Sequence, residues 1–201
     1  MHVHTSISSP CSFIDPERAI KRAKEIGLDG ICVTDHDGTE GAEIAFELGK
    51  KLGFPVFRGL EVYTEFGDVI IFGVYDNDFT WKVSFDEVIE ICRNKEGIAI
   101  VAHISKTSTS FSNEEREVFF GRMLRRVNAI ETHNGGSTPD ENERALKIAQ
   151  RYSLTGVGGS DAHHEFQIGR CVTVFEKPVV TERELVKAVR EGICRGKYGF
   201  S

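Results

Sequence analysis

The sequence lacks the cysteine patterns of disulfide-rich and zinc-knuckle proteins. No two cysteines form a Cys-x-x-Cys pair, and the set is odd in number and widely spread: Cys11, Cys32, Cys92, Cys171 and Cys194. Such a set is neither a disulfide framework nor a metal knuckle. Cys32 and Cys171 fall in apolar, strand-like runs, so we predict that both are small buried residues. We therefore expect a reducing, cytoplasmic location.

Long apolar runs, targeting segments and linkers are also missing. No stretch approaches the roughly 20 apolar residues that a membrane helix needs, so no membrane association is expected. We see no signal peptide, internal repeat or Pro/Ser-rich linker. A chain of 201 residues with 40% hydrophobic and 28% charged residues is typical of one soluble globular domain, so we predict a single domain over residues 1–201.

An excess of positive charge is absent too. The formal net charge is −6 at pH 7, which argues against a general nucleic-acid-binding surface. The net charge does not exclude a local basic patch. The densest basic cluster is explained by the solvated face of a helix; it comprises Arg122, Arg125 and Arg126.

What the sequence does contain is a regular alternation of apolar runs and helical patterns. Strands are predicted at 30–34, 55–64, 69–73, 98–102, 129–131, 154–157 and 171–175. Helices are predicted at 16–26, 40–52, 84–95, 113–126, 138–152 and 181–191, the last of which closes the chain. Asp15 is expected to cap the first helix, and Ser84 with Glu87 forms a capping-box pattern. About seven strands alternating with helices predict a parallel α/β architecture.

An open, doubly wound sheet and a closed barrel both fit this alternation. Histidines and acidic residues fall at or just after the C-terminal ends of many strands. The C-terminal rim of a barrel collects such residues into one site, which favours a small or irregular barrel.

The first candidate site residues are His2 and His4. On an extended strand both side chains point to the same face, and two neutral imidazoles side by side can chelate a divalent metal. A bare His-x-His is also typical of a tag remnant or a frayed tail. Because only Met1 precedes this strand, we expect the order of residues 1–5 to depend on the metal.

Two further strands carry candidate ligands. Asp35, His36 and Asp37 directly follow the strand at 30–34, where burying unpaired charge is costly. Alternatively, Asp35 caps the next helix and His36 has no role. Glu61 lies within an apolar strand, where a carboxylate is rarely buried unless it is paired or metal-bound. A solvent-facing position on an edge strand is the alternative.

The pattern recurs at two later strand ends. His103 ends the strand at 98–102, although a hydrogen-bonded core histidine is the commoner outcome for one such residue. Asp161 and His163 are two residues apart just past the strand at 154–157, after glycines that let the backbone approach a ligand. A polar, Gly-rich turn is the alternative.

Taken jointly, these residues favour a metal site of mixed histidine and carboxylate ligands. Such ligation, without thiolate, suits Zn²⁺, Mn²⁺ or Fe²⁺ at a hydrolytic site. The candidates exceed the needs of one tetrahedral ion, so we expect two or three metal ions and a bridging carboxylate. The predicted ligands are His2, His4, Asp35, His36, Glu61, His103, Asp161 and His163.

Five stretches follow one another in a specific order. They are His2-x-His4-Thr5, Gly30-Ile31-Cys32-Val33-Thr34-Asp35-His36-Asp37, Gly59-x-Glu61-Val62, Ala102-His103 and Gly159-Ser160-Asp161-Ala162-His163, with Gly169-Arg170 downstream. In this order they resemble the PHP (polymerase and histidinol phosphatase) family of metal-dependent phosphoesterases. The resemblance implies a distorted, TIM-like (β/α)7 barrel with two or three metal ions on its C-terminal rim. It also implies hydrolysis of a phosphate ester, with Glu61 as the bridging carboxylate and seven residues at ligand positions: His2, His4, His36, Glu61, His103, Asp161 and His163.

The chain departs from the family pattern at three places. Met1 occupies the Leu position of the usual Asp-Leu-His-x-His opening, so the Asp is missing. The His or Asp that follows the His-Thr stretch is replaced in Ser8-Ser9-Pro10-Cys11, and we assign the nearest carboxylate, Asp15, to a helix cap. A family histidine after the strand at 69–73 is replaced near Tyr75-Asp76, where Asp76 or His133 could compensate.

The resemblance and the residues together suggest a mechanism. A metal-bridging hydroxide would attack phosphorus in line with the leaving group. Arg170 would neutralise phosphoryl charge or else serve as a structural salt-bridge residue, and His36 or His163 would protonate the leaving group. Lys106 is a further candidate phosphate contact, and His164 is interpreted as a bystander.

The expected substrate is a small phosphorylated metabolite or nucleotide. One alternative is an exonuclease-like phosphodiesterase, which would need a basic groove that the acidic balance of the chain disfavours. The other is a catalytically degraded metal-binding module, which the missing ligands would support. The sequence leaves the oligomeric state open.

Overall fold

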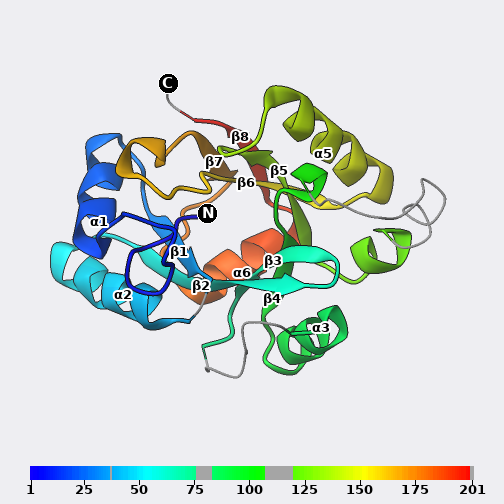
Figure 1. Ribbon diagram of the computed structural model, residues 1–201, viewed down its shortest axis with the longest axis horizontal. Helices are drawn as coiled ribbons and strands as arrows, with labels where there is room; N and C mark the ends of the chain where they lie inside the picture. The colour runs from blue at the N-terminus through cyan, green and yellow to red at the C-terminus, as the bar shows by residue number, and fades with distance from the viewer. Residues whose placement is uncertain (37, 76–82, 107–119, 200–201) are drawn as a thin grey trace.

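A computed structural model of the chain describes residues 1–36, 38–75, 83–106 and 120–199 (Figure 1). Six strands form one curled sheet in the order β1-β2-β3-β4-β5-β6. Their bounds are β1 Ile31–Asp35, β2 Val56–Thr64, β3 Gly67–Phe72, β4 Ile98–Val101, β5 Ala129–Asn134 and β6 Thr155–Gly159.

The prediction of a parallel sheet is wrong at β3, which is antiparallel to both β2 and β4. Only Glu65 and Phe66 separate β2 from β3, and Thr64 pairs with Gly67. A parallel crossover needs a dozen or more residues, so this short connection enforces a hairpin. The pairs β1–β2, β4–β5 and β5–β6 are parallel as expected.

The N-terminal residues close the barrel between β1 and the segment after β6. His4 N donates a hydrogen bond to Ala162 O at 3.0 Å, and Thr34 N donates to Val3 O at 2.9 Å. Val3 and Ala162 form a parallel bridge. This segment adds a seventh strand position, and the predicted fold class of a small, distorted α/β barrel is confirmed.

The predicted strand at 171–175 lies outside the barrel sheet. It forms β7 (Cys171–Phe175), which pairs antiparallel with β8 (Cys194–Tyr198). The expectation that a helix closes the chain is therefore wrong. β8 escaped prediction because Arg195, Gly196 and Lys197 interrupt any apolar pattern. Gly158 allows the hairpin to approach β6, since a Cβ atom there would lie 2.3 Å from Val172 O.

The helices surround this barrel close to their predicted bounds. They are α1 (Pro16–Glu25), α2 (Glu40–Leu52), α3 (Phe85–Asn94), α5 (Pro139–Tyr152) and α6 (Glu182–Glu191), with short 3₁₀ turns η1 (Ile104–Lys106) and η2 (Glu165–Gln167). Asp15 caps α1 by accepting hydrogen bonds from Glu17 N and Arg18 N, and Ser84 with Glu87 forms the predicted capping box. Of the helix predicted at 113–126, residues 113–119 lie outside the described residues. None of the described helices is long and apolar enough to cross a membrane.

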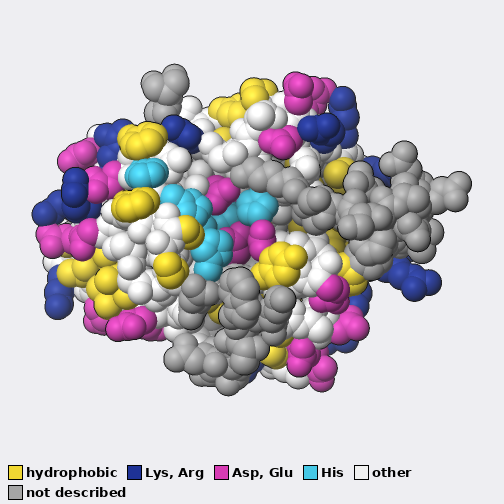
Figure 2. All heavy atoms as spheres, viewed as in Figure 1, with side chains coloured by type: hydrophobic (Ala, Val, Ile, Leu, Met, Phe, Trp, Pro, Cys, Tyr) yellow, Lys and Arg dark blue, Asp and Glu magenta, His cyan; other side chains and the backbone are white. Residues whose placement is uncertain are grey.

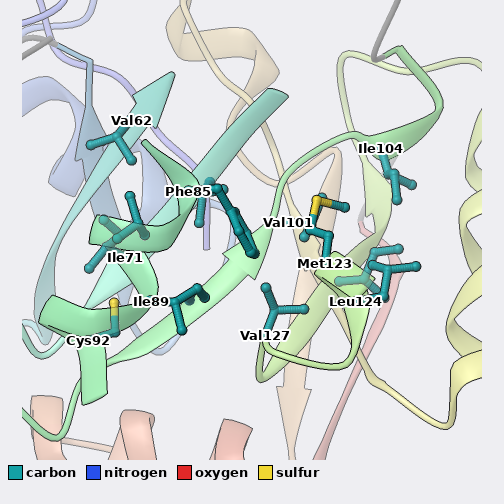
Figure 3. Packing of buried hydrophobic residues seen from close by; sticks show 14 of the residues in the cluster. Val62, Ile71, Phe85, Ile89, Cys92, Val101, Ile104, Met123, Leu124 and Val127 are labelled. Atoms are coloured by element: carbon teal, nitrogen blue, oxygen red, sulfur yellow. The ribbon is translucent and has the colours of Figure 1, made fainter. Parts of the chain in front are cut away.

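Side chains on the outer face of the sheet pack beneath α3 and its neighbours. Val62 and Ile71 are buried there with Phe85, Ile89 and Leu124 (Figure 3). Burying one such side chain contributes about 1.5–3 kcal/mol, so this layer fixes the curvature of β2 to β5 from outside.

Side chains on the inner face form a second apolar layer, which α6 closes. Ile70, Ile100 and Val157 pack against Leu185 and Val189 of α6. Figure 1 shows α6 crossing the space that the strands enclose. This apolar plug fills one end of the barrel and leaves the other end for polar residues.

Candidate metal centre

Polar inner-face residues lie at the end of the barrel away from α6. Side chains two residues apart on a strand share a face. Glu61 therefore shares the inner face with Phe57, and Glu131 shares it with Ala129, both of which belong to the apolar plug. Glu61 and Glu131 are each 1% exposed, which rules out a solvent-facing edge position for Glu61.

Glu61 is surrounded by four imidazoles. Its Oε2 atom lies 3.2 Å from His2 Nε2, 3.4 Å from His4 Nε2 and 3.1 Å from His36 Nδ1. Its Oε1 atom lies 3.2 Å from His103 Nε2. Figure 2 shows histidine and acidic side chains gathered in the middle of the molecular surface seen in that view. The contacts on both oxygens agree with the position expected of a bridging carboxylate.

Asp161 and His163 complete the arrangement from the segment after β6. Asp161 Oδ1 lies 3.6 Å from both His2 Nε2 and His4 Nε2, and the rings of His4 and His163 stack with centroids 4.4 Å apart. Asp161 and His103 adopt positive φ angles of 50° and 23°. Strained backbone of this kind concentrates at functional sites.

Potential ligand atoms form four overlapping groups, each within 4.8 Å. The groups are His4, His36 and His163; His2, His103 and Asp161; His2, His4 and Glu61; and Glu61, Asp68 and His103. Seven of the eight predicted ligands are therefore brought together, and Asp35 is not among them.

Three buried atoms at the centre of these groups need a partner. His2 Nε2, His4 Nε2 and Glu61 Oε2 have no hydrogen-bond partner among the described residues. A buried polar atom without a partner costs about 1–3 kcal/mol. A divalent cation would satisfy all three atoms at once, so the residues present fit a metal centre.

Glu131 orients His2 from behind. Its Oε1 atom lies 3.2 Å from His2 Nδ1, while Oε2 accepts hydrogen bonds from His103 N at 3.1 Å and Asn134 Nδ2 at 2.8 Å. A carboxylate on the far ring nitrogen fixes the tautomer of a metal-binding histidine, and here it leaves Nε2 for the metal. Sequence reasoning missed Glu131, although an acid in an apolar strand was the signal used for Glu61.

Asp35, predicted as a ligand, lies outside the four groups and forms hydrogen bonds with the segment that carries His4. Its carboxylate accepts hydrogen bonds from Thr5 N, Thr5 Oγ1 and Ser9 Oγ. Both oxygens thus have protein donors, and Asp35 does not cap α2, whose N-cap is Thr39. Ser9 Oγ gives its one proton to Asp35, so its 3.3 Å contact with His4 Nδ1 requires a proton on that nitrogen. The Nε2 atom of His4 is then free for the metal.

Asp68 was also missed, and the cause is the direction of β3. Its Oδ2 atom lies 3.7 Å from His103 Nε2. A replacement ligand was expected after the strand at 69–73, where a parallel strand would end at the site. Because β3 is antiparallel, its N-terminal end reaches the metal centre instead. Asp76, proposed for this role, lies outside the described residues, as does Asp37.

The remaining candidates lie apart from the four groups. His133 packs edge-on against Tyr198 with ring centroids 5.0 Å apart. Arg170 is exposed, and its guanidinium lies 5.3 Å from the ring centroid of Phe166. Lys106 ends η1. The three arginines of the basic cluster are exposed as predicted, but Arg125 and Arg126 lie in the turn after the helix that holds Arg122.

Burial and the neighbouring charges favour the metal-binding forms of His4 and Glu61. Burial lowers the pKa of His4 to about 4, so its ring is neutral near pH 7, the form that binds metal. Burial also acts to lower the pKa of His2, but Glu61, Glu131 and Asp161 raise it well above its usual value. Burial acts to raise the pKa of Glu61, yet the neighbouring histidines hold it well below its usual range. Glu61 is therefore ionised.

Known proteins share parts of this sequence. A family model described as PHP-associated matches residues 139–194. The uncharacterized protein MJ1587 of Methanocaldococcus jannaschii is 31% identical over 113 residues, which cover 51% of this chain and 65% of that protein. The PolC-type DNA polymerase III of Oceanobacillus iheyensis is 36% identical over 61 residues, which cover 30% of this chain and 4% of the polymerase. The chain thus spans less than two thirds of either relative.

Solved structures share the fold. PsfC from Pseudomonas syringae has a TM-score of 0.68 at 20% identity, covering 90% of this chain and 82% of that one. A two-domain protein from Bacteroides vulgatus contains a predicted PHP-like metal-dependent phosphoesterase. Its TM-score is 0.69 at 17% identity, covering 98% of this chain and 63% of that one. At these identities the likeness establishes the fold alone.

The fold and the ligand groups define a distorted α/β barrel with a histidine-rich candidate metal centre at one end. A PHP-associated family model and a PolC-type DNA polymerase each match part of the chain, so the chain is similar to the PHP domain family of metal-dependent phosphoesterases.

Proposed function

We propose that this chain is a metal-dependent hydrolase that cleaves phosphate esters of a small phosphorylated metabolite or nucleotide. The observation that carries the proposal is the convergence of three buried atoms without a hydrogen-bond partner among the described residues, His2 Nε2, His4 Nε2 and Glu61 Oε2. When bound, divalent ions supply charge neutralisation at phosphoryl oxygens and activation of a water nucleophile.

The ligand groups support more than one ion. His2, His4, Glu61 and Asp161 would hold one ion, since each pair of neighbouring donor atoms is 3.2–3.6 Å apart where a contact is given. The group that includes His103 and Asp68 would hold a second on the other oxygen of Glu61. A third ion would be held by His36 and His163, because the one free ring nitrogen of His4 is already used by the first ion. Two or three ions of Zn²⁺, Mn²⁺ or Fe²⁺ fit these nitrogen and oxygen donors.

Among the imidazoles of the ligand groups, His36 and His163 are the most exposed to solvent. Their side chains are 34% and 27% exposed, whereas His2 and His4 are fully buried. A bound substrate would reach these two first, which places either of them to hold a proton for the leaving oxygen. The neutral ring of His4 and the ionised Glu61 are committed to ligation.

A second candidate function is phosphodiester cleavage. The match to a PolC-type DNA polymerase favours it, while the net charge of −6 counts against a long nucleic-acid groove. Retention of seven predicted ligands, with Glu131 and Asp68 added, counts against a degraded module.

The test starts from protein purified without chelators. Metal analysis should find about two or three Zn, Mn or Fe ions per chain. With added Mn²⁺, the protein should release p-nitrophenol from p-nitrophenyl phosphate faster than from bis(p-nitrophenyl) phosphate. A preference for the diester would favour the phosphodiesterase. No turnover with any of these metals, despite tight metal binding, would sink both hydrolytic functions.

A further inference from the structure

An exposed row of flat side chains lies beside the metal centre. We call Phe13, His164, Phe166 and Arg170 the rim stack. The rings of Phe13 and His164 are nearly parallel, at 8° with centroids 5.0 Å apart. His164 and Phe166 are 18° from parallel at 5.5 Å, and the Arg170 guanidinium lies 5.3 Å from the Phe166 centroid. Three rings are thus close to parallel, and one cation lies over the last of them.

The rim stack is fixed to the candidate ligand His163. Phe13 N donates a hydrogen bond to His163 O at 2.9 Å, and His164 is the next residue in the chain. The backbone N–H groups of His163 and His164 both donate to Gln167 Oε1 at 2.8 Å. These hydrogen bonds fix the backbone positions of Phe13 and His164 relative to His163. The stack is a preorganised extension of the site.

The phenyl rings are held in water rather than buried. Phe13 is 72% exposed and Phe166 is 64% exposed, the two highest values among the large hydrophobic residues that the structure describes. Adjacent exposed apolar groups mark interaction sites, and their placement next to a site for phosphate points to the substrate. Hydrophobic side chains lie next to the central histidines on the face in Figure 2.

The chemistry of the stack selects its ligand. Parallel aromatic faces capped by a guanidinium present π surfaces and a cation, the surroundings in which proteins stack nucleobases. A sugar phosphate or an aliphatic phosphate would leave these faces in water. The positive charge of Arg170 lies over Phe166, so Arg170 acts on the base end of a ligand rather than on phosphorus.

We propose that the rim stack binds the base of a nucleotide whose phosphate lies at the metal centre. The inference rests on the proposed phosphoesterase function for the position of the phosphate, and it narrows the substrate class to base-bearing phosphates. Phe13 and Phe166 are then specificity-determining residues, and His164 is a base contact rather than a bystander.

The test compares two ligands that differ only by the base. Adenosine 5′-monophosphate and ribose 5-phosphate are titrated calorimetrically into the metal-loaded chain. Stacking predicts that the mononucleotide binds about 5- to 100-fold more tightly. Phe13→Ala and Phe166→Ala should each remove a large part of this ratio and leave the Kd of ribose 5-phosphate within about twofold.

Matched variants separate stacking from apolar contact. Phe13→Leu and Phe166→Leu keep a large apolar group without a π face, so both should lose the preference for the nucleotide. Phe166→Trp should keep or increase it. All five changes are at exposed side chains and should leave the melting temperature within about 2 °C, because exposed substitutions alter stability by about 0.5 kcal/mol or less.

The outcomes distinguish this inference from the proposed function. Equal affinity for both ligands, binding of neither, or Leu variants that behave like the parent would overturn the rim stack as a base site. A change of oligomeric state in Phe13→Ala without any change in nucleotide affinity would overturn it in favour of a protein contact. A base preference that depends on both phenyl rings, in a chain that hydrolyses no phosphate ester, would support the rim stack and reject the phosphoesterase.

Discussion

His2 Nδ1 lies 3.2 Å from Glu131 Oε1, and both side chains are buried. The other oxygen of Glu131 accepts hydrogen bonds from His103 N and Asn134 Nδ2. Glu131 therefore links two candidate ligands from one inner-face position on β5. Every group around it donates a proton, so only a carboxylate satisfies them all.

Glu131→Gln should weaken metal binding about 10- to 100-fold, as expected for loss of a carboxylate behind a metal-binding histidine. The new amide would either point its NH₂ group at two N–H donors or lose its acceptor for His2. Competition with a chromogenic zinc chelator measures the affinity.

Glu143→Gln is the matched control, because Glu143 is exposed and contacts only Lys147 in the ion pairs given for it. It should bind metal like the parent chain. Parental affinity in Glu131→Gln would show that Glu131 does not orient His2.

Glu61→Gln should abolish hydrolysis and lower the bound metal while leaving the fold largely intact. The change keeps the shape of the side chain but removes the charge that faces His2, His4, His36 and His103. Metal analysis and circular dichroism report the two effects separately. Glu90→Gln, at an exposed position on α3, is the control. An active, metal-replete Glu61→Gln chain would remove Glu61 from the metal centre.

Removing the metal should lower the melting temperature without releasing the N-terminal strand completely. A ligand at 100 times its Kd stabilises the native state by about 2.7 kcal/mol, and removing the metal with a chelator removes this stabilisation. The strand itself has partners on both sides, through His4 N to Ala162 O and Thr34 N to Val3 O. Hydrogen exchange after chelator treatment should therefore keep measurable protection at Thr34. Full exchange there would mean that metal alone orders residues 1–5, and an unchanged melting temperature would argue against a bound metal.

The strand and helix positions could be predicted because their signals are local. The N-cap at Asp15 and the capping box at Ser84 mark helix starts through backbone hydrogen bonds formed within three residues. Glu61 could be predicted because a charge in an apolar strand demands a partner wherever that strand lies.

The errors arise where tertiary pairing decides. Nothing local to Asp68 tells that β3 runs antiparallel, and a ligand at a strand's start is visible only once that direction is known. Asp35 has the composition of a ligand, but Thr5 and Ser9 reach it from a segment 26 to 30 residues away. β8 forms because Gly196 permits close approach to β6, and its charged sequence gives no apolar signal.

The hydrogen bond between Thr5 and Asp35 leaves no room for a side chain at Gly41. A Cβ atom at Gly41 would lie 2.2 Å from both Asp35 Oδ2 and Thr5 Oγ1. Gly41→Ala should therefore displace one of these groups, break the hydrogen bond between them, and destabilise the fold by about 1–3 kcal/mol. Chemical denaturation measures this loss.

The same displacement should also reach the metal. Thr5 follows His4 in the chain, and Ser9 contacts both Asp35 and His4 Nδ1. A shift of Asp35 should therefore change the direction in which His4 Nε2 points. Metal affinity should fall in Gly41→Ala together with stability. Gly38→Ala, just before α2, is the control, since a Cβ atom there meets only Ser8 Oγ, at 4.0 Å. A Gly41→Ala chain could lose stability and still bind metal as tightly as the parent chain. That result would show that Asp35 stabilises the fold but does not orient the His4 ring.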